Sequence, residues 1–203
     1  MQTFEITATA LTLLCIILAV KEKIWTFPLG LIGTAMYFYI FYSQRVYSSM
    51  LLQTVFFAFN VYGLYRWTHP KKEESNSDNT LAVSGLTVNQ RIITAILIVF
   101  LTVVLSFVMS HLNQWLPALF PEAAKSVWID TYILSASLVA QYLMAVKKWE
   151  NWIIWLMVDV IATPFYFITV GWVTGLLYLV FVFTSASGIV EWRKSLKNKQ
   201  KNL

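Results

Sequence analysis

One carboxylate, Asp159, lies deep within a hydrophobic run that also carries Trp152, Trp155 and Tyr166. These residues are spaced by three, four and seven positions, so a helix brings them to one face. An ionisable side chain at membrane depth costs about 3 kcal/mol and usually faces a bundle interior or a cavity. There Asp159 can meet a cationic substrate, relay protons or stay neutral in a hydrogen bond. The residues alone leave these three roles open.

Uncharged polar side chains mark further helix faces. Gln53 and Asn60 are seven residues apart, which places them within about 20° of each other around a helix. Gln141 lies deep within another apolar run, and Tyr178 and Ser185 repeat the seven-residue spacing in the last one. We expect these groups to line a polar path between helices. Amides in membranes also bond helix to helix, which is the alternative role.

The chain lacks the motifs of an ATP-driven pump and of the common hydrolases. No Gly-x-x-x-x-Gly-Lys-Ser/Thr loop, His-Glu-x-x-His pair or Ser/His/Asp set occurs in the sequence. Cys15 is the single cysteine, and His69 and His111 are too isolated to hold a metal. We therefore expect a protein that is not an enzyme and that needs no cofactor or metal.

The elements that position these residues follow from the composition, which is that of an all-α membrane protein. Of 203 residues, 58% are hydrophobic and 12% are charged, against about 25% charged in a typical soluble domain. A spanning helix needs about 20 apolar residues, and the hydrophobic runs predict seven transmembrane helices. They are expected at Phe4–Val20, Ile24–Ser43, Ser48–Trp67, Ile92–Leu112, Trp128–Val146, Trp152–Thr169 and Trp172–Trp192.

The basic residues predict the orientation of these spans. Seven spans leave Arg45 and Lys125 on one side of the membrane and the other 13 of the 15 Lys and Arg residues on the opposite side. Because positive residues collect on the cytoplasmic side, we expect the N-terminus outside and the C-terminus in the cytoplasm of a bacterial inner membrane. The net charge of +5 then reflects loops facing anionic lipid, and no nucleic-acid partner is expected.

An internal repeat is indicated by residues that recur at nearly constant separation. The separations are 126, 127, 127, 125 and 125 for Ala19-Val20-Lys21 with Ala145-Val146-Lys147, Trp25 with Trp152, Tyr39 with Tyr166, Gly63 with Gly188 and Trp67 with Trp192. Three helices and one intervening helix separate the copies, so the second triplet enters the membrane from the same side as the first. The sequence therefore predicts parallel repeats in a 3+1+3 plan, which is a transporter architecture.

This plan divides the chain into five segments. A polar, charged stretch separates the repeats and has the composition of a mobile cytoplasmic linker. The expected segments are the first three-helix repeat at 1–67, the linker at 68–91, the connecting helix with an outer loop at 92–127, the second three-helix repeat at 128–192 and a basic cytoplasmic tail at 193–203.

Several of these residues resemble the signature of the PnuC-type vitamin transporters. They are Leu51-Leu52-Gln53 followed by Asn60, Tyr62-Gly63 and Trp67, then Glu150-Asn151-Trp152-Ile153-Ile154-Trp155, and later Leu177-Tyr178 and the spacing of Gly188 to Trp192. The resemblance covers nearly the whole chain. It implies a fold similar to a full-length SWEET sugar transporter, with one substrate site per protomer of a homotrimer.

The resemblance also implies a substrate and a mechanism. The usual substrate is nicotinamide riboside, taken up by facilitated diffusion and trapped when a cytoplasmic kinase phosphorylates it. Thiamine, and beyond it riboflavin, are the alternative vitamins of the family. A second alternative is a membrane scaffold that binds no ligand, and a third is proton-coupled transport through Asp159.

Site residues are implied by the same resemblance. Nicotinamide riboside and thiamine both carry a cationic aromatic ring, which Trp152 or Trp155 can hold by a cation–π interaction. Gln53 and Asn60 would read hydroxyls or ring nitrogens, and Gln141, Asn151, Tyr166 and Tyr178 complete the expected set. Asp159 departs from the family pattern, because some nicotinamide riboside members carry Asn there, and this departure bears on the substrate.

Overall fold

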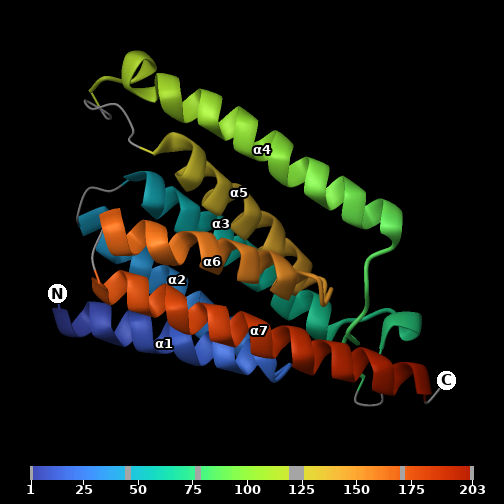
Figure 1. Ribbon diagram of the computed structural model, residues 1–203. Helices are drawn as coiled ribbons and strands as arrows, with labels where there is room; N and C mark the ends of the chain where they lie inside the picture. The colour runs from blue at the N-terminus through green and yellow to red at the C-terminus, as the bar shows by residue number, and fades with distance from the viewer. Residues whose placement is uncertain (1, 44–46, 76–78, 119–125, 170–171, 202–203) are drawn as a thin grey trace. The chain divides into compact units, whose positions relative to one another are not determined.

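The computed structural model describes residues 2–43, 47–75, 79–118, 126–169 and 172–201. Within them the chain forms seven α-helices and one short 3-10 helix (Figure 1). In chain order these are α1 (Gln2–Val20), α2 (Thr26–Ser43), α3 (Tyr47–Thr68), η1 (Lys72–Glu74), α4 (Val88–Trp115), α5 (Val127–Ala145), α6 (Asn151–Thr169) and α7 (Trp172–Lys201). The all-α class expected from the hydrophobic runs is confirmed.

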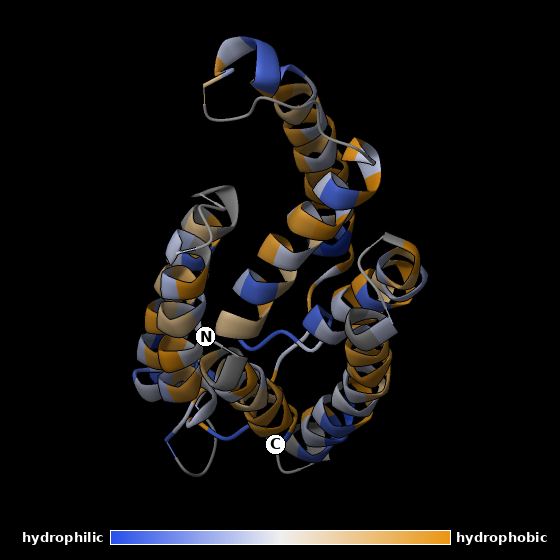
Figure 2. Ribbon diagram, turned by 90° about the vertical axis from the view of Figure 1, so that its left-hand side faces the viewer, coloured by the Kyte–Doolittle hydropathy of each residue, from blue (hydrophilic) through white to orange (hydrophobic). Residues whose placement is uncertain are grey.

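Three helices within the described residues are long and apolar enough to cross a membrane. They are Val88–Trp115, Asn151–Ile168 and Gly175–Asn198. Two shorter apolar helices, Ile6–Val20 and Thr26–Ile40, accompany them. Figure 2 shows the hydrophobic colour recurring along the helices, as expected where the solvent is lipid.

Helix α4 is longer than its hydrophobic run predicts, because a capping box starts it early. It begins at Val88 rather than Ile92. The Gln90 amide donates to Thr87 Oγ1 at 3.3 Å, and the Thr87 amide donates to Gln90 Oε1 at 2.9 Å. Two amides that a helix start leaves without partners are thereby satisfied.

Helix α7 also runs past its predicted end. Its hydrophobic part was expected to stop at Trp192, but the helix continues to Lys201. Residues 193–201 contain no Gly or Pro, and Lys, Arg, Leu and Gln all favour a helix. The predicted basic tail is therefore helical as far as the structure describes it, while residues 119–125 of the predicted outer loop lie outside the described residues.

The chain forms two compact units, and the first comprises residues 1–85, 141–153 and 183–203. Within it α2 packs against both α1 and α3, which Figure 1 draws in blue to teal. Hydrogen bonds join α1 to α2: Thr26 Oγ1 donates to the Cys15 carbonyl at 2.9 Å, and Thr9 Oγ1 lies 3.0 Å from the Tyr37 hydroxyl. Phe27, buried among these helices, belongs to the core.

Part of the linker is buried, which its polar composition does not predict. Leu81, Ala82 and Val83 are buried in the first unit, although the surrounding sequence is polar. Their burial follows from hydrogen bonds that hold the chain on either side: the Leu81 amide donates to the Trp67 carbonyl at 3.1 Å, and the Ser84 amide donates to the Lys147 carbonyl at 3.1 Å. Residues 81–83 of the expected linker are therefore packed into the first unit.

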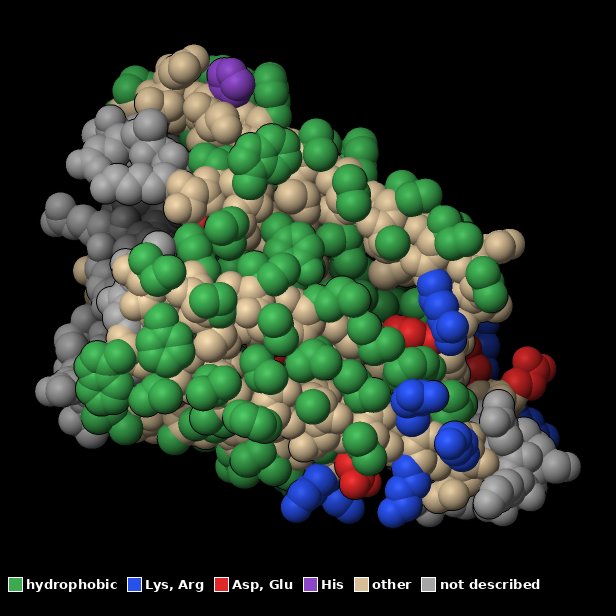
Figure 3. All heavy atoms as spheres, in the orientation of Figure 1, with side chains coloured by type: hydrophobic (Ala, Val, Ile, Leu, Met, Phe, Trp, Pro, Cys, Tyr) green, Lys and Arg blue, Asp and Glu red, His purple; other side chains and the backbone are tan. Residues whose placement is uncertain are grey.

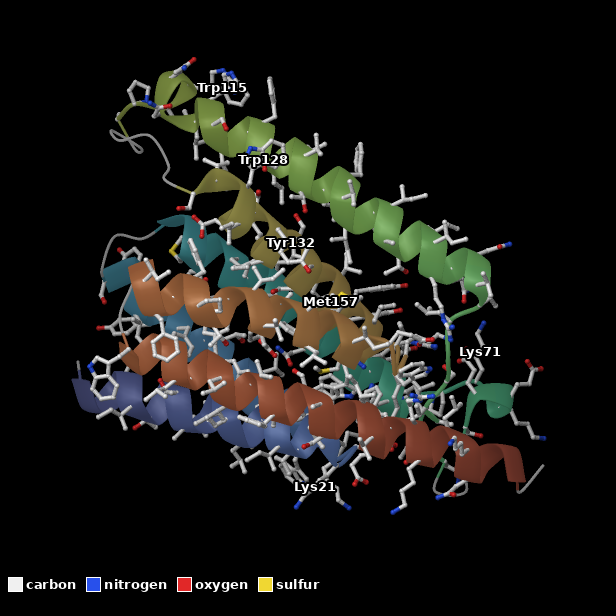
Figure 4. The ribbon with its side chains drawn as sticks, in the orientation of Figure 1. Lys21, Lys71, Trp115, Trp128, Tyr132 and Met157 are labelled. Atoms are coloured by element: carbon white, nitrogen blue, oxygen red, sulfur yellow. The ribbon has the colours of Figure 1, made fainter. Side chains whose placement is uncertain are left out.

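Basic side chains mark one end of the first unit. Lys21 follows α1 and Lys71 precedes η1 (Figure 4), and both are exposed. In Figure 3 the Lys and Arg side chains in view gather at the end of the face where α7 ends. Arg193 lies over the Trp149 ring there, 5.0 Å from its centroid. We call this the basic end of the first unit.

The second unit comprises residues 86–140 and 154–182. Its helices α4 and α5 are joined by a buried hydrogen bond of 2.6 Å between Ser106 Oγ and Thr131 Oγ1. Trp115, at the end of α4, and Trp128, at the start of α5, are more than half exposed (Figure 4). Exposed tryptophans at helix ends are typical of the belt at a membrane surface.

Candidate functional site

Two turns of the first unit have the same backbone structure, one after α1 and one after α5. Glu22 and Lys147 both have φ of 55°, a left-handed conformation that few non-glycine residues adopt. The Glu22 amide donates to the Ala19 carbonyl and the Lys147 amide to the Met144 carbonyl, each at 3.0 Å. Corresponding residues of the two turns are 125 positions apart.

The separation of 125 corrects part of the repeat predicted from the sequence. Trp25 was matched with Trp152 at 127, but Trp25 is 66% exposed, whereas Trp152 is buried. Phe27 is the residue 125 positions before Trp152, and it is buried too. The Ala-Val-Lys match at 126 is likewise out of register by one residue, because the turn geometry pairs Glu22 with Lys147.

Buried tryptophans link the two sets of helices reciprocally. Trp192 Nε1, on α7, donates to the Ala19 carbonyl of α1 at 3.0 Å. Trp67 Nε1, on α3, donates to the Met144 carbonyl of α5 at 3.3 Å. The two tryptophans are 125 residues apart, and so are the two residues whose carbonyls they bind, so the two hydrogen bonds are equivalent. The two tryptophan rings also contact each other, with centroids 5.9 Å apart.

Glycines make room for the aromatic rings of this cluster. Gly63 faces the Phe27 ring and Gly188 faces the Trp152 ring so closely that neither site has space for a Cβ. The resulting ring pairs have the same geometry: Phe27 and Trp67 meet edge to face at 4.9 Å and 86°, and Trp152 and Trp192 at 5.6 Å and 87°. The predicted Gly63–Gly188 match therefore corresponds to a shared packing role.

An ion pair joins the two turns themselves. Lys147 Nζ lies 3.0 Å from Glu22 Oε2 and 4.3 Å from the centroid of the Trp67 ring. Lys147 is 1% exposed, and burial lowers the pKa of its ammonium while Glu22 partly raises it again. A carboxylate and an aromatic face together hold this cation, as in other cation–π sites.

Two expected binding residues of the first unit each have a polar atom without a hydrogen-bond partner among the described residues. Asn151 Nδ2 donates to the Lys148 carbonyl at 2.6 Å, but Asn151 Oδ1 and the Trp152 indole N–H have no hydrogen-bond partner among the described residues. Asn60 Nδ2 donates to the Phe56 carbonyl at 2.9 Å. Buried polar atoms are normally paired, so Asn151 and Trp152 have hydrogen-bonding capacity that a ligand can use.

Two further expected residues of the first unit, Gln53 and Gln141, are half-buried. Asn60 is buried, and its side-chain amide packs against Gly30, where a Cβ would collide with it. The local packing thus fixes the Asn60 side chain more firmly than the two glutamines. Five of the nine expected binding residues, Gln53, Asn60, Gln141, Asn151 and Trp152, lie in this unit.

The other four expected residues lie in the second unit. Asp159 on α6 is only 3% exposed, and its backbone carbonyl accepts a hydrogen bond of 2.7 Å from Thr163 Oγ1. Tyr166 and Tyr178 bring α6 and α7 together, with ring centroids 4.6 Å apart. The Trp155 indole N–H is buried with no partner among the described residues.

Sequence reasoning missed the ion pair and the role of Phe27. Glu22 and Lys147 differ in type and charge, so a search for identical residues does not pair them. The available signal was their position. Each is the third residue after a buried residue near a helix end, Ala19 for Glu22 and Met144 for Lys147. The two are 125 positions apart, which is also the separation of Trp67 and Trp192.

The long apolar helices among the described residues define a class of protein, the polytopic helical membrane proteins. The comparison with known sequences narrows the class: the chain matches the nicotinamide mononucleotide transporter family over residues 2–194 and belongs to that family. Membership of a transporter family agrees with the expectation that the chain is not an enzyme.

Individual relatives cover nearly the whole chain. It is 29% identical to the nicotinamide riboside transporter PnuC of Escherichia coli, over 96% of this chain and 87% of that protein. It is 25% identical to the riboflavin/roseoflavin transporter RibM of Streptomyces davaonensis, over 93% and 83%. A crystal structure of the vitamin B3 transporter PnuC superposes with a TM-score of 0.66 at 25% identity, covering 94% of this chain and 80% of that one.

Proposed function

We propose that the protein takes up nicotinamide riboside by facilitated diffusion. Membership of the transporter family and the similarity to nicotinamide riboside transporters support this substrate. The observation that carries the proposal is the α6 stripe, in which a buried carboxylate, Asp159, follows Trp152 and Trp155, whose indole N–H groups have no partner among the described residues. An acid and aromatic faces suit a cationic aromatic ring.

The proposed architecture has seven spans in parallel 3+1+3 repeats, with the N-terminus outside and the C-terminus in the cytoplasm. The turns and indole contacts that recur at a separation of 125 support the repeats. The basic end of the first unit, which includes the end of α7, supports a cytoplasmic C-terminus, because positive residues collect on that side.

The residues proposed to bind the substrate are Gln53, Asn60, Gln141, Asn151 and Trp152 of the first unit and Trp155, Asp159, Tyr166 and Tyr178 of the second. Among them the tryptophans hold the cationic ring, Asp159 neutralises its charge, and the amides bind the ribose hydroxyls. A cation–π contact is worth up to about 2 kcal/mol when desolvated. Phosphorylation by a cytoplasmic kinase then traps the nucleoside, and the chain works as a homotrimer.

Thiamine is the second candidate substrate, because it too carries a cationic aromatic ring that Asp159 would favour. Riboflavin, named for the Streptomyces relative, has a neutral ring system. A neutral ring offers the Asp159 carboxylate no opposite charge, so it adds no Coulombic attraction there. The site chemistry therefore ranks the cationic vitamins above riboflavin.

Calorimetric titration of the purified protein with nicotinamide riboside, thiamine and riboflavin, each separately, tests the proposal. Trp152→Ala should abolish saturable binding of nicotinamide riboside, while Trp25→Ala, which removes an exposed tryptophan, should leave it unchanged. Binding of thiamine alone would replace the substrate. Absence of binding for all three, with a folded protein, would favour a scaffold that has no ligand.

A further inference from the structure

Two pairs of corresponding residues in the first unit contact each other. Glu22 and Lys147 form the 3.0 Å ion pair, and the Trp67 and Trp192 rings lie 5.9 Å apart. In each pair the partners are 125 residues apart. Residues related by a twofold axis are close to each other only where both are close to that axis. Within the first unit, both pairs therefore lie close to the axis that relates the two turns and their tryptophans.

The position of this axis gives the pairs a functional meaning, which rests on the proposed transport function. In transporters built from parallel repeats, the axis runs along the membrane normal and the substrate path lies between the repeats. The two pairs lie at the basic end of the first unit, where α3 ends and Lys21 follows α1. This is the proposed cytoplasmic end of the path.

We propose that Glu22 and Lys147, backed by Trp67 and Trp192, are the gate that closes the cytoplasmic end of the transport path. All four act across the repeats: the ion pair joins the two turns, and each indole donates to a carbonyl of the other triplet. Trp67, Trp192 and Lys147 are at most 1% exposed. No opening for a nucleoside exists between side chains that are this completely covered.

The linker is hydrogen-bonded to the same gate residues. The Leu81 amide donates to the carbonyl of Trp67, and the Ser84 amide donates to the carbonyl of Lys147. Ser84 in turn accepts from the Trp149 amide at 3.1 Å. The linker thus spans from the end of α3 to the turn after α5, and its amides are bonded to the backbone of two gate residues. Opening the gate must break these hydrogen bonds or carry the linker along.

Reversible crosslinking tests the gate directly. Glu22→Cys with Lys147→Cys, in a Cys15→Ser background, is joined by a short bifunctional methanethiosulfonate reagent, and uptake of labelled nicotinamide riboside into proteoliposomes is measured. Crosslinking should reduce uptake at least tenfold, and a reductant should restore it. Calorimetric binding to the crosslinked protein should persist, because only the path to the cytoplasm is closed.

The matched control uses Arg66→Cys with Glu74→Cys. This ion pair has the same length, 3.0 Å, but it joins α3 to η1 and not one repeat to the other. Crosslinking it should leave uptake at the uncrosslinked rate. Unchanged uptake after crosslinking positions 22 and 147 would overturn the gate, and so would an equal loss in the control pair.

Charge exchange supplies a test that needs no substrate. Hydrogen exchange at residues 81–84 of the purified protein should quicken about tenfold or more in Lys147→Gln, because the half-buried Glu22 loses its partner and the contact between the two turns is lost. Exchanging the charges, Glu22→Lys with Lys147→Glu, should restore part of the protection, since the ion pair re-forms with its direction reversed while the cation–π contact with Trp67 is lost. Lys23→Gln is the control, because Lys23 lies in the same turn as Glu22 but is exposed.

The two tests distinguish a failure of the gate proposal from a failure of the substrate proposal. If the uncrosslinked protein takes up no nicotinamide riboside, the substrate assignment fails, and the hydrogen-exchange result decides the gate. If Lys147→Gln exchanges no faster than Lys23→Gln, or the charge exchange fails to restore protection, the gate fails whatever the substrate is.

Discussion

The substitution Gly188→Ala tests whether Trp152 binds the substrate, because the new methyl group would displace its ring. A Cβ at position 188 would lie 2.6 Å from Trp152 Cε3, where real contacts begin above 3 Å. Trp152 is 1% exposed and cannot swing into free space. Overpacking of this kind costs about 1–3 kcal/mol, partly offset by the roughly 1 kcal/mol by which Ala favours a helix over Gly.

The corresponding substitution, Gly63→Ala, supplies the control. A Cβ there would lie 2.7 Å from Phe27 Cζ, in a ring pair of the same geometry. Both variants should therefore lose a similar amount of stability, measured as the midpoint of thermal unfolding in detergent. Only Gly188→Ala displaces a ring that is proposed to hold the ligand.

The expected difference in binding follows from the cation–π contact. Losing about 2 kcal/mol weakens binding about 30-fold, which calorimetry resolves easily. Gly63→Ala should bind within about threefold of the parental protein, because its disturbance lies at Phe27. If both variants lost binding equally, or if Gly188→Ala bound normally despite reduced stability, Trp152 would have no direct role in binding.

Three further outcomes are expected. Asp159→Asn should weaken binding of cationic vitamins by about tenfold, equivalent to about 1.4 kcal/mol, and calorimetry would contradict the charge argument if affinity were unchanged. Trp192→Phe removes the donor to the Ala19 carbonyl and should lower the free energy of unfolding by about 1–2 kcal/mol; an unfolding midpoint equal to that of the parental protein would refute this. Arg66 lowers the pKa of Glu74, so their pair adds stability above the usual carboxyl pKa and loses it as pH falls through the folded value. After correction for the intrinsic pH dependence of amide exchange, protection near η1 should accordingly fall in acid, and Arg66→Gln should remove that fall.

The helices were predictable because each is a long hydrophobic run, and lipid requires every backbone group in such a run to be bonded internally. Their ends were less predictable. The start of α4 depends on a capping box, which the residue types of Thr87 and Gln90 indicate. The extension of α7 past Trp192 has no such signal, because residues 193–201 only lack a Gly or Pro that would end the helix.

The register of the repeat could be predicted only approximately from residue identity. Identical letters paired Trp25 with Trp152, but packing pairs Phe27 with Trp152, because either ring fills the space left by a glycine. Residue charge was misleading in the same way, since Glu22 and Lys147 have equivalent backbone conformations but side chains of opposite charge. What recurs is shape, and shape tolerates changes of residue type.

The predicted binding residues remain proposals, and those of the first unit differ in the support that their surroundings give. Asn151 and Trp152 have unpaired polar atoms in a packed, well-defined cluster. Gln53 and Gln141 are only half-buried, and nothing in their surroundings distinguishes a ligand contact from a helix-to-helix bond. Sequence spacing located the polar faces but could not rank their members.

The ion pair between Glu22 and Lys147 also bears on how such a chain can evolve. In a symmetric dimer of identical half-length chains, the same residue would stand at both positions, so Glu would face Glu or Lys would face Lys, and like charges at this distance repel. Joining both copies in one polypeptide lets the two positions mutate independently. The attraction at the axis is therefore available only to the fused protein, and its acquisition would make separation of the halves costly thereafter.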